Sequence, residues 1–530
     1  MCEEAIPQSD DRDVGSVARQ GEQAGEGGSL GAGQDRSRHF ISDWLLVTAA
    51  AFSLYTLTAN RGAQWQDCGL FILNIVQGEL VNPLGLALTH PLHYWLGRLA
   101  IWPGVLEPSF AITLVSSLGA AVAVANVFGG VRALTDRRSA ALWAAASLAM
   151  AHTFWKLATV AEVYTISAAL LAGECWCLIL FMRTGRRTHL WAGLLLNGLG
   201  IGNHLQATLM LPVWLGVLAW GLAGRRIRWA DMAVGGLLWL VGTLPYSGLV
   251  AVEMAHSGDW RVTLGSALFG SSSLGYADSV LNVALSARLL AVSGGFTLLS
   301  FPNLLLPAAL YGLWRWRMLG LPRGLRGALG VGLLVHAGFA CRYNVVDQYT
   351  FFLPAYVLTA ILGGAGAAAV LGWAPSTRRR VIWAAIIMLA ATPVVYAAAP
   401  SAARWLGVLE GVARHKAYRD DYVYLLTPWS VVERSADRMG REAVALAGPE
   451  GTILVEDPMG RPAVRYHAHR SGWADLVVLA VPAGQPEWIA DLSRQMAADG
   501  RRVVLVPADV TREPPAEVSW RRVGELYVLE

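Results

Sequence analysis

Long apolar segments separated by short polar ones dominate the chain from residue 42 to residue 399. A helix that crosses a bilayer needs about 20 mostly apolar residues, and about eleven segments of this region approach that length. We expect spans at 42–59, 108–133, 139–155, 158–182, 189–203, 205–223, 229–252, 287–314, 327–341, 350–372 and 380–399. The pattern therefore predicts an all-α, polytopic membrane bundle.

The chain outside this region follows other patterns. Residues 1–40 are rich in Gly, Ser, Gln, Asp and Arg, which predicts a disordered tail. The tail has no apolar core with a cleavage site, so we expect the first span to insert as a signal anchor. Residues 402–425 predict an amphipathic surface helix that carries Arg414, His415, Lys416 and Arg419.

The last hundred or so residues predict a small α/β domain with a mainly parallel sheet. Short β-type runs stand at 452–457, 475–480, 502–507 and 525–530. They are separated by helical patterns at 430–447, 461–470 and 486–498. No glycine-rich phosphate loop opens these helices, so we assign the domain no nucleotide.

The composition agrees with a membrane protein. The chain is 55% hydrophobic and 15% charged, with a mean hydropathy of +0.43, which is outside the range of an ordinary soluble domain. The formal net charge is +4. Its arginines stand in short clusters between apolar spans, so membrane topology explains them and we expect no nucleic-acid partner.

The arginine clusters fall in alternate loops, near residues 132–138, 183–187, 225–228, 315–326 and 378–380. Because such loops stay on the cytoplasmic side, the other loops are expected outside the cytoplasm, in an integral plasma (inner) membrane. The expected organisation is a tail at 1–40, a membrane domain at 41–400 with a first outer loop at 60–107, and a linker helix with an extracytoplasmic α/β domain at 401–530.

Ionisable residues from five separate parts of the chain converge on the outer loops. They are Asp67, His90, His93, Arg98, Lys156, Glu162, His204, Arg342 and Asp347. Charged groups beside a membrane are costly unless they are paired or used. Charges of both signs at one depth therefore favour a functional site.

Each of these residues also has a structural interpretation. Asp67 and Asp347 can act as helix N-caps, and a neutral histidine beside a capping turn is often structural. Lys156 and Glu162 can satisfy each other as an ion pair. The sequence leaves these alternatives open.

The motifs around these residues resemble a family of multispanning proteins with the GT-C glycosyltransferase fold, related to protein O-mannosyltransferases. Such proteins have an Asp-x-Gly-Glu motif in the first outer loop, followed by a His-Pro, a Trp near Glu-Val-Tyr, a Gly-x-x-His turn and a Tyr-x-x-x-Asp segment before Phe-Leu-Pro. This chain has Asp67-Cys68-Gly69, His90-Pro91, Trp155 with Glu162-Val163-Tyr164, Gly200 and Gly202 with His204, and Tyr343 with Asp347 and Phe352-Leu353-Pro354. It departs from the family at Leu70, where a glutamate is usual.

The resemblance implies transfer of a hexose from a polyprenyl-phosphate donor to an extracytoplasmic hydroxyl on a protein or glycan. Asp67 would be the general base. The substrate-binding residues would be His90, His93, Arg98, Trp155, Lys156, Glu162, Tyr164, His204, Arg342 and Asp347. Among them, the candidates for holding the lipid phosphate are Lys156, His90, Arg98, His204 and Arg342. We predict no metal ligand and no cofactor beyond the lipid-linked sugar donor, and a need for a divalent metal is left open.

Two other functions fit the same sequence. A membrane transporter or lipid flippase would need broken helices with paired charges at the bilayer midplane, whereas the charges here gather at one rim. Leu70 favours the second alternative, a catalytically inactive envelope scaffold.

Overall fold

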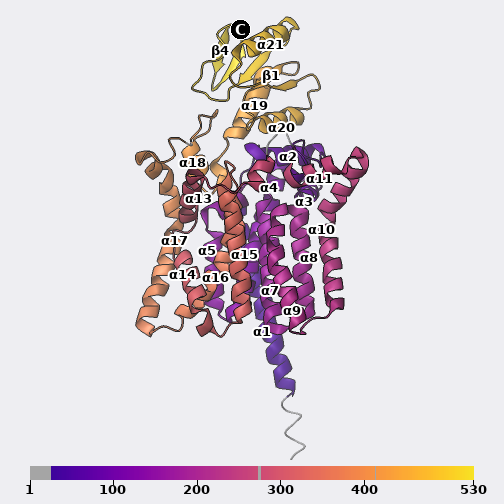
Figure 1. Ribbon diagram of the computed structural model, residues 1–530. Coiled ribbons are helices and arrows are strands. Elements are labelled where there is room, and N and C mark those ends of the chain that lie inside the picture. The colour runs from indigo at the N-terminus through magenta and orange to yellow at the C-terminus, as the bar shows by residue number, and fades with distance from the viewer. Residues whose placement is uncertain (1–25, 272–275, 412) are drawn as a thin grey trace, which may run out of the picture.

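The computed structural model describes residues 26–271, 276–411 and 413–530. It contains a bundle of helices with a smaller α/β domain above one end (Figure 1). The bundle contains α1(Glu26–Thr58), α2(Gln66–Gln77), α3(Pro91–Ile101), α4(Pro108–Thr135), α5(Arg138–Ala149), α6(His152–Ala158), α7(Tyr164–Thr184), α8(Arg187–Asn203), α9(Leu211–Ala223), α10(Trp229–Ser257), α11(Trp260–Phe269), α12(Tyr276–Leu281), α13(Ala287–Ser300), α14(Leu305–Arg315), α15(Arg323–Arg342), α16(Leu353–Val370) and α17(Pro375–Trp405). Short 3₁₀ helices span Leu86–Leu88, Leu205–Met210, Trp316–Leu319, Gln348–Phe352 and Ser430–Val432.

The bundle is built from membrane-spanning helices, as the sequence predicts. Among the described residues, eight helices are long and apolar enough to cross a membrane, and the pair α13 and α14, bent by 91°, makes a ninth. The expected spans at 139–155 and 189–203 correspond to α5 with α6 and to α8, which have 12, 7 and 17 residues. Length and apolarity therefore support eight or nine of the eleven expected spans and leave these two unconfirmed.

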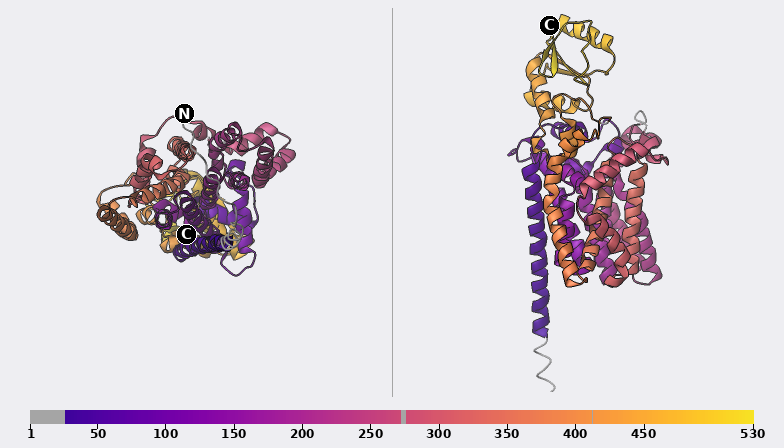
Figure 2. Two further views of the ribbon diagram at one scale, coloured as in Figure 1. Left: turned by 90° about the horizontal axis from the view of Figure 1, so that it is seen from below. Right: turned by 90° about the vertical axis from the view of Figure 1, so that its left-hand side faces the viewer.

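The two ends of the bundle differ. One end carries α2, α3 and α11 and meets the C-terminal domain, and we call it the domain face (Figure 1). At the opposite end, here the arginine face, α1 extends beyond the other helices (Figure 2). Because α1 begins at Glu26, the helix includes residues 26–40 of the expected tail, while residues 1–25 lie outside the described chain. A helix that already exists extends at little cost.

The C-terminal domain has the predicted α/β composition. It contains α18(Asp421–Leu426), α19(Ser435–Ala447), β1(Thr452–Val455), α20(Arg461–Ser471), β2(Val477–Ala480), α21(Pro486–Ala498), β3(Val503–Val506), β4(Trp520–Val523) and β5(Leu526–Leu529). The sheet order is β2-β1-β3-β5-β4. Strands β1, β2 and β3 are parallel, whereas β5 pairs antiparallel with β3 and with β4. The sheet is therefore mixed.

The prediction of an amphipathic helix at 402–425 is wrong. Helix α17 continues to Trp405 and then ends in a turn where Gly407 and Leu409 have φ of 64° and 79°, values that interrupt a right-handed helix. Two of the four cations expected on its polar face are buried in the C-terminal domain instead. Lys416 pairs with Asp457 at 2.9 Å, and Arg419 pairs with Asp421 at 2.6 Å.

Small residues allow helices of the bundle to approach closely. Helix α14 packs against α16, and a Cβ at Gly366 would overlap the carbonyl oxygen of Ala308. Gly312 faces the same interface, where its Cβ would lie 2.7 Å from the backbone nitrogen of Gly366. Without water to drive association, membrane helices gain stability from such close packing.

We therefore expect Gly366→Ala to destabilise the bundle by about 1–3 kcal/mol, because the new methyl group overpacks the interface between α14 and α16. Thermal unfolding in detergent measures the change. Gly327→Ala in α15 is the matched control, since nothing lies within 4 Å of its Cβ position. An equal effect of the two substitutions would contradict this view of the interface.

Candidate active site

The first turn of α2 presents Asp67 at the domain face. The N-cap residue of this helix is Trp65, so Asp67 does not have the capping role that the sequence allowed. The side chain of Asp67 is exposed, although Trp65 and Cys68 on either side are buried. The surrounding protein desolvates the carboxylate and raises its pKa. Asp67 is thus accessible to a substrate while it lies in a protein environment.

Three carboxyl groups from different parts of the chain interact at this position. The charge of Asp67 raises the pKa of Glu162 and of Asp347, in addition to the larger effect of burial on each. The pKa of Glu162 rises to about 8 and that of Asp347 to about 6. The thiol of Cys68 donates to Glu162 Oε1 at 3.2 Å, and the Val163 N–H donates to its other oxygen. These two hydrogen bonds favour the ionised form, but burial outweighs them, so Glu162 holds its proton near pH 7 and Asp67 is the exposed member of the three carboxyl groups.

Lys156 lines a small pocket together with Cys68, and among the described residues it forms no ion pair with Glu162. Its Nζ lies 4.7 Å from the ring centre of Tyr424 in the C-terminal domain. Burial lowers the pKa of Lys156 to about 8, and the charge of Glu433 opposes that shift. Lys156 is thus a partly buried cation whose main contact is an aromatic ring.

Trp155, the residue before it, has a packing role. It is 4% exposed, and its indole N–H donates to Thr58 Oγ1 at 3.0 Å. Its ring meets that of Trp429 edge to face, with centres 5.7 Å apart. Trp155 therefore joins α1, α6 and the segment that leads into the C-terminal domain.

The three predicted histidines come together beneath α2. The rings of His90 and His204 are stacked, with centres 5.0 Å apart and planes at 8°. Phe71 contacts the rings of His90 and His93, and Tyr164 contacts that of His204. Burial lowers the pKa of His90 to about 4 and those of His93 and His204 to about 3. The three imidazoles are therefore neutral at pH 7.

The two arginines predicted to bind substrate donate hydrogen bonds to backbone carbonyl groups. Arg98 donates to the carbonyl of Ile75 near the end of α2, at 2.9 Å. Arg342 donates to the carbonyls of Asn282 and Val280, at 2.8 and 2.5 Å. Arg98 thus contacts the last turn of α2, and Arg342 contacts the last turn of α12 and the residue that follows it.

The C-terminal domain holds the residue before Asp67, which the sequence did not indicate. Gln66 has a left-handed φ of 59°, which is unfavourable for a residue with a side chain. Its N–H donates to the carbonyl of Met459 at 2.9 Å, and its Oε1 accepts from the Tyr424 hydroxyl at 3.2 Å. These contacts fix the direction in which helix α2 begins.

Trp65 adds to the contact between the start of α2 and the C-terminal domain. It is 2% exposed, and its indole N–H donates to Ser435 Oγ at 2.7 Å. The guanidinium of Arg419 lies between the rings of Trp65 and Tyr424, 4.9 and 4.3 Å from their centres. The only sequence sign of this contact was the mixture of aromatic and charged residues at 418–424.

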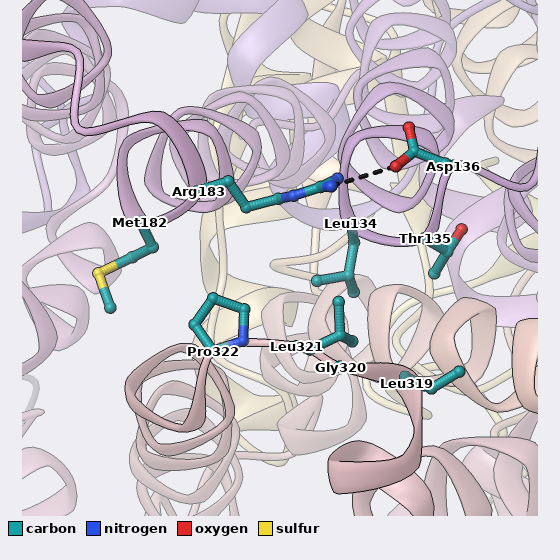
Figure 3. Close-up of a pocket in the computed structure, with 9 residues that line it drawn as sticks. All are labelled: Leu134, Thr135, Asp136, Met182, Arg183, Leu319, Gly320, Leu321 and Pro322. Atoms are coloured by element: carbon teal, nitrogen blue, oxygen red, sulfur yellow. Dashed lines mark hydrogen bonds and ion pairs between the residues drawn. The ribbon is translucent and has the colours of Figure 1, made fainter. Parts of the chain in front are cut away.

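A cavity lies away from these residues, at the arginine face. It has a volume of about 270 Å³ and lies between the ends of α4 and α7 and the turn before α15 (Figure 3). Its only charged side chains, Arg183 and Asp136, pair with each other at 3.1 Å. With no base available there, we place the candidate active site at the domain face. Across the described part of the chain, no group of three or more His, Cys, Asp or Glu side chains is arranged to hold a metal ion.

Comparisons with known proteins agree with this architecture. Residues 67–224 match the model of the protein O-mannosyl-transferase TMEM260 N-terminal domain. The structure of ArnT from Cupriavidus metallidurans bound to undecaprenyl phosphate superposes with a TM-score of 0.56 at 16% identity, covering 92% of this chain and 97% of ArnT. No curated protein matches the sequence.

Two further structures are less similar to this chain than ArnT is. The archaeal oligosaccharyltransferase AglB from Archaeoglobus fulgidus, in complex with an inhibitory peptide and a dolichol-phosphate, has a TM-score of 0.48 at 12% identity, covering 89% of this chain and 69% of AglB. The arabinofuranosyltransferase AftD from Mycobacteria has a TM-score of 0.47 at 17% identity, covering 88% of this chain and 35% of AftD.

The predicted fold class is thereby confirmed. The motif that begins at Asp67 coincides with the start of the matched family region. The chain is a multi-pass membrane protein with the GT-C glycosyltransferase fold, and its residues 67–224 match the model of the TMEM260 N-terminal domain.

Proposed function

We propose that this protein transfers a hexose from a polyprenyl-phosphate donor to a hydroxyl group of an acceptor at the domain face. The observation that carries the proposal is the accessible carboxylate of Asp67 in the first turn of α2, beside the buried carboxyl groups of Glu162 and Asp347. The proposal applies the chemistry of the GT-C fold to this site.

In the proposed reaction Asp67 accepts the proton of the acceptor hydroxyl. The acceptor oxygen then forms a bond to the anomeric carbon of the sugar, and the bond from that carbon to the lipid phosphate breaks. The phosphate leaves with the bonding electrons and gains negative charge. Lys156, which has no carboxylate in hydrogen-bonding contact in the described chain, is placed to stabilise that charge.

The proposed orientation places the domain face outside the cytoplasm of a plasma (inner) membrane. The arginine clusters of the short loops stand at the opposite end of the bundle, which is the end that faces the cytoplasm under the positive-inside rule. A protein is the acceptor suggested by the matched family model.

The position of Leu70 bears on activity. Leu70 lies one turn of α2 after Gln66 and is half-buried. A glutamate at this position would add a fourth carboxyl group to the site. Its absence removes one repulsive charge from Asp67, and we propose that the three remaining carboxyl groups suffice for transfer.

A transporter remains the second candidate because of one feature, the 91° bend between α13 and α14. Broken helices line substrate sites in many transporters. Movement of a labelled polyprenyl-phosphate hexose across proteoliposomes, without transfer of its sugar, would favour this alternative.

Replacement of Asp67 tests the proposed base. We expect Asp67→Asn to lower sugar transfer from a polyprenyl-phosphate hexose about 100-fold or more, because proton abstraction contributes about 10²–10⁴-fold to such reactions. Asp67→Glu should retain part of the activity, since it keeps a carboxylate. Thermal unfolding of both variants controls for folding, and undiminished transfer by a folded Asp67→Asn protein would refute the role of Asp67.

The raised pKa of Glu162 predicts a dependence of stability on pH. Because the folded chain holds this proton more tightly than the unfolded chain, Glu162 contributes most stability at low pH and loses it as the pH rises from about 4.5 to about 8. We expect Glu162→Gln, which resembles the protonated form, to reduce the fall in melting temperature across this range. Glu442→Gln is the control, since the pKa of Glu442 is lowered. Identical pH profiles for wild type and Glu162→Gln would contradict the prediction.

A further inference from the structure

Four polar side chains beneath α2 form a group that we call the histidine cluster: His90, His93, Asn203 and His204. His90 and His93 belong to the start of α3, whereas Asn203 and His204 lie at the end of α8. Asn203 Nδ2 donates to the carbonyl of Val163, the residue after Glu162. Phe71 lies one helical turn after Asp67 and touches His90 and His93. The cluster is therefore adjacent to the carboxyl groups of the candidate active site.

Hydrogen bonds fix the form of two imidazoles. His90 Nδ1 lies 2.9 Å from the carbonyl oxygen of Asn203, which only accepts, so this nitrogen carries the proton and Nε2 has a free lone pair. His204 Nδ1 accepts from the N–H of Gln206 at 3.1 Å, so its Nε2 carries the proton. The cluster thus presents one acceptor and one donor from two stacked neutral rings.

Two further polar atoms of the cluster have no partner within the described structure. They are Nε2 of His93 and Oδ1 of Asn203, and both residues are 1% exposed. Buried polar atoms are nearly always hydrogen-bonded, so two unpaired atoms in one cluster point to a ligand that completes them. Oδ1 of Asn203 requires a donor, whereas Nε2 of His93 can donate or accept according to the tautomer of its ring.

Aromatic rings surround this polar group. Besides Phe71, Tyr164 meets the ring of His204 at 5.4 Å, and Phe351 lies 5.5 Å from Tyr164. Phe71, Tyr164 and His204 are only half-buried, so the cluster reaches the surface at His204, whereas His90, His93 and Asn203 are buried. Neutral donors and acceptors among aromatic faces suit a ligand that has both hydroxyl groups and apolar C–H faces.

We propose that the histidine cluster binds hydroxyl groups of the donor hexose, an assignment that rests on the proposed function. The sequence analysis had grouped His90 and His204 with the cations as candidates for the lipid phosphate. The stacked contact of His90 and His204 opposes a positive charge on both rings, and the lowered pKa values agree with neutral imidazoles. Recognition of the sugar and of the phosphate is therefore divided between the histidine cluster and Lys156.

His93→Phe tests the proposal, because it removes an unpartnered nitrogen and keeps an aromatic ring. A purely structural histidine with no partner should tolerate this change. We expect the folded variant to bind undecaprenyl phosphate as wild type does and to bind its hexose-bearing form about tenfold more weakly, because one hydrogen bond to the sugar is lost. Binding is measured in detergent micelles with each lipid separately.

His204→Asn is a second variant, since asparagine can still accept from the Gln206 N–H and loses the donor of Nε2. His152→Phe is the matched control: His152 is 1% exposed, as His93 is, but it packs against Phe296 and Tyr396 outside the cluster. It should leave the affinity for both lipids unchanged.

Each outcome separates the inference from the proposed function. If His93→Phe and His204→Asn weakened the binding of both lipids equally, the cluster would be assigned to the phosphate and the inference would be overturned. Equal affinity of wild type for both lipids would also overturn it. Binding that prefers the hexose-bearing lipid, together with no sugar transfer by wild type to any acceptor, would support the cluster and contradict the proposed transferase activity.

Discussion

The mutual repulsion of three carboxyl groups determines the chemistry available at the domain face. Asp67, Glu162 and Asp347 come from three separate segments, and the charge of Asp67 makes ionisation of the other two more costly. Such a group is stable only if some members keep their protons. Burial keeps the proton on Glu162 and outweighs the hydrogen bond from the Cys68 thiol, which favours the ionised form, so the accessible Asp67 is the member best placed to act as a base.

The C-terminal domain is part of this arrangement and not an independent appendage. Its contacts hold Gln66 in a left-handed conformation and bury Trp65, the two residues before Asp67. A strained residue persists only where its surroundings hold it. Here the surroundings are Met459, Tyr424 and Ser435, all from the C-terminal part of the chain. The position of the proposed base thus depends on a domain that follows it by more than 300 residues in sequence.

Much of the fold followed from the sequence because apolar length and periodicity are direct consequences of burial. Strands β1 and β3 are fully buried and appear as continuous apolar runs, so they were predicted. Strand β4 was missed, since Arg521 and Arg522 are exposed and interrupt its pattern. The helix expected at 402–425 failed because its charges pair with distant partners such as Asp457, which local periodicity does not reveal.

The candidate site was only partly predictable for the same reason. Topology alone indicated that Asp67, Glu162 and His204 would meet at one face of the membrane. Their protonation states depend on burial by neighbours from other helices, such as Phe71 and Tyr164, and the sequence did not give these. Asn203 and Gln66 were missed because their roles depend on unpaired atoms and backbone conformation.

An experimental structure of the protein in a lipid nanodisc, with a non-transferable polyprenyl-phosphate hexose bound, tests the central claim most directly. Our account predicts the sugar between Asp67 and the histidine cluster, with the phosphate on the side of Lys156. A sugar bound at the arginine face, or one separated from Asp67 by the wall of α2, would contradict it.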